Sequence, residues 1–356
     1  MKLNKKYIAL NNLIILQRGF DLPEIERVIG NIPVVASTGI IGSHNIAKVK
    51  GPGVVIGRSG SIGGGQYVAS DFWPLNTTLW VKDFKEHNPR FIYYVLKNID
   101  FSRFNFGTGV PTLNRNHIAN IKVLAFDKSQ EEKIADILSK YDDLIENNRR
   151  RIELLERSAR LLYKEWFVRL RFPGHEHTPI IDGIPEGWER LKLGEVLTLQ
   201  RGFDLPSAKR THGQYPIFAS TGINGYHEKA KVQAPGIVTG RSGSLGKVMY
   251  IAEDFWPLNT TLYVKDFIKV DAVFALHLLE NLHLEQYNAG AAVPTLNRND
   301  IHKIKVLCPS CTLKSLFLAF ANPIYTQIHF LDRYNQKLKQ ARDILLPKLM
   351  NGEIEV

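Results

Sequence analysis

The residues of this chain best suited to bind a polyanion lie in a short glycine-bounded motif that occurs twice. Residues 57–61 read GRSGS, and residues 240–244 read GRSGS again. The glycines predict a tight turn, and arginine and serine are residue types that bind phosphates or, for arginine, reach guanine edges. A β-turn with a solvated arginine is the structural alternative. The candidate DNA-binding residues of this motif are Arg58, Ser59, Ser61, Arg241, Ser242 and Ser244.

Two further repeated motifs place polar and basic side chains beside Gly or Pro turns. One is LQRGFDLP at 16–23 and 199–206, and the other is VPTLNRN at 110–116 and 293–299. Arginine suits guanine edges and asparagine suits adenine edges, although capping of the turns would explain the same residues. The candidate DNA-binding residues here are Arg18, Asn114, Arg115, Arg201, Asn297 and Arg298.

No catalytic constellation accompanies these motifs. GRSGSLGK at 240–247 has five residues between the first glycine and the Gly-Lys pair, where a phosphate loop has four. No Ser-His-Asp, paired-carboxylate or metal-ligand set repeats in both halves. Cys308 and Cys311 form a single CPSC without further zinc ligands, and we interpret them as incidental reduced thiols. We therefore expect a chain that is not an enzyme and holds no metal or cofactor of its own.

The motifs belong to one unit that is duplicated. Leu16 and Leu199 start identical octapeptides, and the same offset of 183 residues aligns ASTGI, GRSGS, DFWPLNTTL and VPTLNRN without insertion. More than half of the positions from Gln17 to Leu124 are identical in the two copies. DFWPLNTTL should be mostly core, and His44 and His227, retained in both copies, should be structural.

Within each copy the local signals are mixed. In the first copy, apolar runs at 54–56, 79–81 and 121–124 predict strands, and 91–97 predicts a short helix. We therefore expect two similar α/β domains.

Each copy is followed by a long helical pattern. Residues 128–170 contain no Pro or Gly and carry apolar residues at coiled-coil spacing, which predicts one helix of roughly 60 Å. Asn148 falls in the seam, where an amide fixes register, so its replacement by Leu should stabilise the coil or shift it. The same offset predicts a second long helix and a tail in 312–356.

The second helix has its own expected features. Its seam is flanked by Tyr334 and Ala341, Pro323 should kink or interrupt it early, and Pro347 and Gly352 should end it.

The chain order is thus domain, helix, domain, helix. Antiparallel pairing of the helices would place the domains at opposite ends around a pseudo-twofold axis, whereas parallel pairing would put both at one end. A twofold object with two equal readers matches the dyad of duplex DNA, so it should read two inverted half-sites around unspecified base pairs. The expected segments are domains 1–127 and 188–311, a central helix 128–170, an extended surface linker 171–187, and the C-terminal helix and tail 312–356.

Composition narrows the partner class. The 356 residues carry a formal net charge of +11 and are 44% apolar, which predicts real cores and a polyanionic partner. We expect nucleic acid rather than membrane, because no amphipathic Lys-rich helix with an aromatic face is present. No apolar run approaches the length of a membrane span or a signal sequence, so we expect a cytoplasmic protein.

The repeated motifs, the junction LLYKEWFVRLRFPGHE…IPEGWERLKLGEV and the tail LLPKLMNGEIEV resemble the specificity subunit of type I restriction-modification systems over nearly the whole chain. The resemblance implies an α+β fold in which two target-recognition domains are separated by a long antiparallel two-helix coiled coil. It further implies that the helices dock two methyltransferase subunits, which carry S-adenosylmethionine and methylate adenine N6 in double-stranded DNA. Restriction subunits, with ATP and magnesium, can join them.

The resemblance leaves open whether the target is palindromic and whether the chain works alone. The recognition domains of such subunits often differ, whereas these are close copies, which suggests a palindromic or near-palindromic bipartite target. The copies diverge most at 98–109 against 281–292 and at 24–29 against 207–212, and half-sites would differ if those segments reach bases. A stand-alone pseudo-dimeric DNA-binding regulator is the alternative, although Trp166 and Phe167 on a basic helix favour a docking partner.

Overall fold

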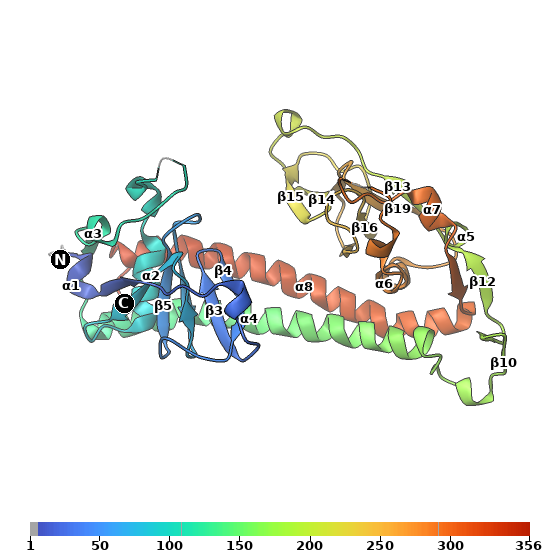
Figure 1. The fold of residues 1–356 in the computed structure, drawn as a ribbon, viewed down its shortest axis with the longest axis horizontal. Coiled ribbons are helices and arrows are strands. Elements are labelled where there is room, and N and C mark those ends of the chain that lie inside the picture. The colour runs from blue at the N-terminus through green and yellow to red at the C-terminus, as the bar shows by residue number, and fades with distance from the viewer. Residues whose placement is uncertain (1–5, 108, 291) are drawn as a thin grey trace. The chain divides into compact units, whose positions relative to one another are not determined.

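The computed structural model describes residues 6–107, 109–290 and 292–356, and the chain divides into two compact units. Unit 1 consists of Met1–Asn148 with Tyr334–Val356, and unit 2 consists of Arg149–Arg333. Each unit contains one repeated domain together with a part of each long helix (Figure 1). The C-terminal residues therefore complete the unit that the N-terminal domain begins.

The first repeated domain combines small sheets with short helices. Its elements are β1 (Tyr7–Ala9), α1 (Leu10–Leu13), β2 (Ile15–Arg18), β3 (Ile32–Ala36), β4 (Gly39–His44), β5 (Gly53–Gly57), β6 (Gly63–Val68), β7 (Trp73–Pro74), β8 (Thr78–Asp83), α2 (Pro89–Asn98), α3 (Arg115–Ile118) and β9 (Lys122–Leu124). One sheet has the order β2-β8-β5-β6 and is antiparallel, a second has the order β4-β3-β7 with β7 parallel to β3, and β1 pairs with β9. The predicted strands and the predicted helix are confirmed as β5, β8, β9 and α2.

The sequence explains these elements locally. All five residues of β5 are buried, as expected for the apolar run GVVIG inside a sheet. Helix α2 begins where Asn88 accepts hydrogen bonds from the backbone N–H groups of Arg90 and Phe91, and Pro89 occupies its first turn.

The second repeated domain has the same order of elements. They are β12 (Glu189–Lys192), α5 (Leu193–Val196), β13 (Leu197–Arg201), β14 (Tyr215–Ala219), β15 (Gly222–His227), β16 (Gly236–Gly240), β17 (Val248–Ile251), β18 (Trp256–Pro257), β19 (Thr261–Phe267), α6 (Ala272–Asn281), α7 (Arg298–His302) and β20 (Lys305–Cys308). Its sheets, β13-β19-β16-β17, β15-β14-β18 and β12-β20, repeat those of the first domain. The duplication seen in the sequence is thus a duplication of the fold.

The two long helices are α4 (Lys128–Tyr163), extended by a π-helical turn at Lys164–Val168, and α8 (Cys311–Met350). The predicted end of the first helix at residue 170 was slightly late, because Leu170 has a positive φ of 58° that no helix continues. The second helix begins one residue before its predicted start.

The helices lie antiparallel within each unit (Figure 1). In unit 1, Asn148 bonds Asn335 while Asp142 bonds Arg342, so residue numbers rise along α4 as they fall along α8. In unit 2, Trp166 of the π-helical turn contacts Phe317. The expected antiparallel helix pair is therefore present.

The seam of unit 1 contains a buried amide pair. Asn148 is 2% exposed, and its Nδ2 donates to Oδ1 of Asn335 at 2.9 Å. The seam position of Asn148 is confirmed, but its partner was missed. Tyr334, expected to flank the seam, is 49% exposed, and Asn335 faces the partner helix instead.

The two prolines of α8 do not interrupt it. Pro323 lies on an exposed face, and Ala319, whose carbonyl loses its usual donor, is exposed to solvent as well. The predicted interruption of the helix at Pro323 is therefore wrong. Pro347 lies within the last turn rather than ending the helix.

The helix α8 ends at a glycine motif. Gly352 has a φ of 62°, its N–H donates to the carbonyl of Leu349, and the N–H of Glu353 donates to the carbonyl of Lys348. This bond pattern satisfies carbonyls that the helix end leaves open, and it favours glycine at this position.

A core of apolar residues joins each domain to its helices. In unit 1, Ile134 of α4 and Leu346 of α8 pack with Phe91 of α2. In unit 2, Phe317 packs against Phe274 with ring centroids 6.0 Å apart. The helices thus position each domain through apolar packing.

Trp166 and Phe167 belong to this core of unit 2. Each is 8% exposed, and both rings contact Phe317. The expectation that they form an exposed docking surface is wrong, because the π-helical turn directs them inward. The linker is not simply extended either: it contains the hairpin β10 (Ile180–Ile181) and β11 (Ile184–Pro185), and Phe172 is buried.

Candidate nucleic-acid interface

The GRSGS motif of the first domain forms the predicted glycine-dependent turn. Gly60 has a φ of 81°, and a Cβ atom on Gly57 would lie 1.8 Å from the carbonyl oxygen of Ser61. In the second domain Gly243 has a φ of 87°, and Gly240 meets Ser244 at the same 1.8 Å. The turn therefore requires glycine at both positions in each copy.

The PTLNRN segment is bonded to this turn. Ser59 and Thr112 form an isolated antiparallel bridge, and the N–H of Leu113 donates to the carbonyl of Arg58 at 2.8 Å. The N–H of Gly60 also donates to the carbonyl of Pro111 at 3.0 Å. Motifs about fifty residues apart in sequence thus form one surface.

The second domain repeats these bonds. Ser242 bridges Thr295, the N–H of Leu296 donates to the carbonyl of Arg241 at 2.8 Å, and the N–H of Gly243 donates to Pro294 at 3.0 Å. The two copies therefore build the surface in the same way.

The DFWPLNTTL segment holds the arginine of the turn. In the first domain the N–H of Arg58 donates to the carbonyl of Thr77 at 2.8 Å, and its Nη1 donates to the carbonyl of Asn76 at 3.2 Å. Arg241 makes the equivalent side-chain bond to Asn259 at 3.3 Å. These bonds orient each guanidinium group while leaving its residue half-buried.

The QRGF motif closes the surface. A Cβ atom on Gly19 would lie 2.2 Å from the carbonyl oxygen of Leu75, so this close approach of two backbones requires glycine. The neighbouring Arg18 side chain is 53% exposed and lies 3.9 Å from Asp21. Arg201 is 50% exposed and lies 3.7 Å from Asp204. Such exposed pairs contribute little to stability, so both arginines can exchange partners readily.

The asparagines of PTLNRN cap short helices. Asn114 Oδ1 accepts the N–H of Asn116 at 3.0 Å at the start of α3, and Asn297 Oδ1 accepts the N–H of Asn299 at 3.0 Å at the start of α7. The structural alternative therefore accounts for both side-chain oxygens. The side-chain amino groups of Asn114 and Asn297 remain suited to donate hydrogen bonds to an acceptor on a ligand.

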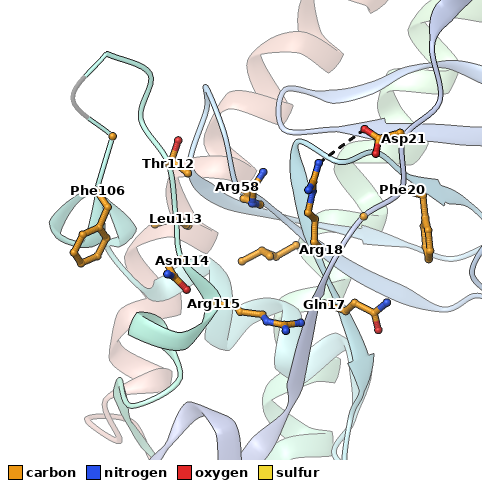
Figure 2. A pocket seen from close by; sticks show the side chains of 13 residues that line it. Gln17, Arg18, Phe20, Asp21, Arg58, Phe106, Thr112, Leu113, Asn114 and Arg115 are labelled. Carbon is orange, nitrogen blue, oxygen red and sulfur yellow. Dashed lines mark ion pairs between the residues drawn. The ribbon is translucent and has the colours of Figure 1, made fainter.

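Four of the six predicted residues of the first domain line one open pocket of about 940 Å³. Arg18, Arg58, Asn114 and Arg115 all line it, and they come from separate segments (Figure 2). Ser59 and Ser61 are not among its lining residues, although Ser61 is exposed beside it in the turn. Three arginines and one acidic residue, Asp21, give the pocket a positive balance suited to phosphate oxygens and base edges.

One histidine of the second domain has a shifted pKa near this surface. Burial and then the charge of Arg298 lower the pKa of His302, and its Nε2 accepts the N–H of Leu199 at 2.9 Å. The bond and the shift both favour the neutral ring. His302 therefore supports the fold rather than carrying charge to a ligand.

Both repeated domains match a known protein family. The family model described as the type I restriction modification DNA specificity domain matches residues 11–157 and 185–316. The chain belongs to this family. Each matched range covers a repeated domain and runs into the helix that follows it.

Individual relatives agree with this assignment. The chain is 25% identical to the type I restriction enzyme MjaIX specificity subunit of Methanocaldococcus jannaschii over 301 residues, covering 75% of this chain and 69% of the relative. It is 22% identical to the HindI specificity subunit of Haemophilus influenzae, covering 68% of this chain and 71% of the relative. The solved S subunit of the type I restriction-modification system of M. genitalium matches with a TM-score of 0.63 at 20% identity, covering 98% of this chain and 96% of that chain.

In this specificity-domain chain, other repeated residues have structural roles. His44 is 5% exposed, its Nδ1 accepts the N–H of Val28 at 3.1 Å, and its ring meets Trp73 edge-on. His227 makes the equivalent contacts with Thr211 and Trp256. The structural interpretation of both histidines is confirmed, and so is the core interpretation of Phe72, Trp73 and Leu75, which are all buried.

Some pocket residues were missed from the sequence. Gln17 and Thr112 line the pocket and lie within the repeated motifs LQRGFDLP and VPTLNRN, so their repetition in both copies was an available signal. Phe106 also lines the pocket and has Ala289 as its counterpart; the sequence pointed to the divergent segment 98–109 that contains it, but not to this residue.

The described residues contain neither a cluster of metal ligands nor a helix that could cross a membrane. Within residues 6–107, 109–290 and 292–356, no three His, Cys, Asp or Glu side chains gather as metal ligands. Over the same residues, no helix is both long and apolar enough to span a bilayer. Cys308 is buried, Cys311 is exposed, and both are free thiols.

Proposed function

We propose that this chain is the DNA-reading subunit of a type I restriction-modification complex in which each repeated domain reads one half of a bipartite, near-palindromic target. The observation that carries the proposal is the shared surface of the two domains. Four separated motifs meet there through the same backbone bonds in both copies. Two equal readers in one chain suit two related half-sites.

The chemistry of the surface supports double-stranded DNA as the ligand. Exposed Arg18 lines the same pocket as Arg58, and Arg241 and the exposed Arg201 occupy the repeated positions in the second domain. The backbones of Arg58 and Arg241 are fixed by turns. Arginine forks held by a rigid turn can donate two bonds to guanine, while the exposed arginines can bind phosphates. The net charge of +11 adds a sequence-independent attraction to the backbone.

The long helices set the spacing and dock methyltransferase subunits in this proposal. Antiparallel pairing would fix the separation and opposite orientation of the readers. Several large apolar side chains on the helices are exposed, including Leu154 and Phe330 at 64% each and Ile344 at 62%. Exposed apolar residues on paired helices suit a protein partner.

Chemical steps belong to the partners. Two methyltransferase subunits would carry S-adenosylmethionine and methylate adenine, and restriction subunits would supply ATP- and magnesium-dependent cleavage where they are present. This chain contributes recognition, and no residue of its own is proposed to act on a reacting atom.

The test is a single-molecule map of methylated adenine in cells that express this chain with its methyltransferase subunits. The expected result is one motif with two related, inverted half-sites around a gap of fixed length. A motif with a single contiguous site would contradict the twin-reader proposal. No methylated motif, together with site-specific binding by the chain alone, would favour a DNA-binding regulator instead.

A further inference from the structure

Among the residues that line the pocket of the first domain, one exposed side chain differs from its counterpart in the second domain. Phe106 of the first domain is 59% exposed and lines the same pocket as Arg58 and Asn114. The position 183 residues later is Ala289. The first reader therefore presents an aromatic ring where the second presents a methyl group.

The backbone that carries this residue is the same in both copies. In the first domain Asn105 Oδ1 accepts the N–H groups of Gly107 at 2.9 Å and Thr112 at 3.0 Å. The N–H of Phe106 donates to the carbonyl of Thr112 at 3.0 Å. The loop end is thus tied to the strand that bridges the GRSGS turn.

The second domain repeats each of these contacts. Asn288 Oδ1 accepts the N–H groups of Gly290 and Thr295 at 2.9 Å each, and the N–H of Ala289 donates to Thr295 at 2.9 Å. The side chain at the tip differs while its support does not. Ala289 therefore demonstrates, within the same molecule, that this loop conformation does not need an aromatic ring.

The ring of Phe106 has a defined position. It packs on His117 of α3 with centroids 4.1 Å apart and planes at 55°. In the second domain the counterpart of His117 is Asp300, which pairs with Lys303 at 3.0 Å. The aromatic pair is a feature of the first domain, and it leaves most of the phenylalanine ring in solvent at the edge of a basic pocket.

An apolar ring among base-reading arginines has a specific use on duplex DNA. The thymine methyl group is the apolar feature of the major groove, and phenylalanine is among the side chains that contact it. Exposure of the ring in the absence of DNA, where burial would be favourable, fits a contact made only in the complex.

We infer that Phe106 contacts a thymine methyl group in the first half-site and that the two half-sites differ at this position, because Ala289 does not reach the corresponding base. The inference rests on the proposed function and deepens it. It gives a near-palindromic target one defined asymmetry, contributed by one residue rather than by the whole divergent segment.

Matched variants test this inference. Wild type, Phe106→Ala and Ala289→Phe are each expressed with the methyltransferase subunits, and the methylated motif is mapped for each. Wild type should require thymine at a position of one half-site that the other half-site does not share. Phe106→Ala should relax that requirement, and Ala289→Phe should impose it on the other half-site. Phe106→Leu, which keeps an apolar side chain, should retain the preference.

Binding of the assembled complex gives a second measurement. Replacing that thymine by deoxyuridine removes only the methyl group and should weaken binding by wild type about fourfold, as expected for loss of one buried methyl. The same replacement should leave binding by Phe106→Ala unchanged. If Phe106→Ala melts at the same temperature as wild type, its altered recognition of the target does not arise from a loss of folding stability.

The contradictory results are distinct. A methylated motif with two identical half-sites, or a motif unchanged by Phe106→Ala, would overturn the inference while leaving the proposed function in place. The absence of any methylated motif for the wild-type complex would overturn the proposed function and this inference with it.

Discussion

The two copies share the GRSGS and PTLNRN motifs of their basic surface but have different residues where each domain meets the helices. The GRSGS and PTLNRN motifs are identical and make the same bonds. By contrast, Ile134 and Leu346 of unit 1 stand where unit 2 has Phe317 and Tyr163. A core needs apolar volume and tolerates exchange of its members, whereas exposed arginines contribute little to folding. The retention of these arginines in both copies therefore fits the proposal that both domains read DNA.

Polar contacts at the same two joints have diverged as well. In unit 1, Tyr94 donates to Asp142 at 2.8 Å, and burial together with that carboxylate raises the pKa of Tyr94. At the equivalent positions of unit 2, the hydroxyl of Tyr325 and His277 Nε2 are 3.1 Å apart. Each joint satisfies its buried polar groups by a different pairing, which is the requirement that burial imposes.

The largest expected effect is on the aromatic joint of unit 2. Phe317 is fully buried and contacts the rings of Tyr163, Trp166, Phe167 and Phe274, so Phe317→Ala should lower the free energy of unfolding by about 3–5 kcal/mol. The matched change in unit 1, Ile134→Ala, should cost less because it removes fewer atoms. Denaturant unfolding followed by circular dichroism measures both. A larger loss for Ile134→Ala would contradict the comparison of the two joints.

The shared surface should respond equally in both copies. Arg58→Ala and Arg241→Ala should each weaken binding of the target by about 1–3 kcal/mol if the arginine contacts a base. Titration of the assembled complex with target duplex at several salt concentrations measures the loss. A salt slope reduced by about 1 for either variant would assign that arginine to phosphate instead. Unchanged binding for both would remove the turn from the interface.

The Asn148–Asn335 amide pair is present in the unit 1 half of the helix seam, whereas the repeated positions in the unit 2 half are apolar. Asn148→Leu alone should destabilise unit 1 by about 1–3 kcal/mol, because it leaves the buried amide of Asn335 without its partner. This reverses the expectation from the sequence, where the partner was unknown. The positions related by the repeat are Leu331 and Ile152, so the double change Asn148→Leu with Asn335→Ile copies the other half of the seam. Thermal melting should show recovery in the double variant, and a further loss there would rule out a simple pairing role.

The smallest expected effect is a pH dependence confined to unit 2. The pKa of His302 lies below its ordinary value of 6.5, because burial and then Arg298 disfavour the charged ring. The unfolded chain therefore takes up this proton first, so stability is full above about pH 6.5 and falls as the pH drops through the lowered value. The first domain has Ala119 at this position, and His302→Ala should flatten the dependence. Thermal melting between pH 5 and 8 measures this dependence. If the melting temperature of His302→Ala varies with pH as it does in wild type, the pH dependence belongs to other groups.

Repetition and periodicity were enough to predict the architecture and most of the candidate site. The offset of 183 residues located the motifs, and the seam pattern located α4 and the buried Asn148. Side-chain direction was harder to predict. Apolar periodicity selected Tyr334 over Asn335, and a π-helical turn, which changes the angle between successive residues, turned Trp166 inward. Phe106 was not predicted as a site residue, because its position depends on a loop that tertiary hydrogen bonds define.

The most direct test of twin reading is a hydroxyl-radical footprint of the assembled complex on its mapped target. Wild type should protect two patches related by a twofold axis. Arg58→Ala should lose protection in one half-site only, and Arg241→Ala should lose it in the other, because each arginine belongs to a separate copy of the same surface. Loss in the same half-site for both variants would contradict the assignment of one half-site to each domain.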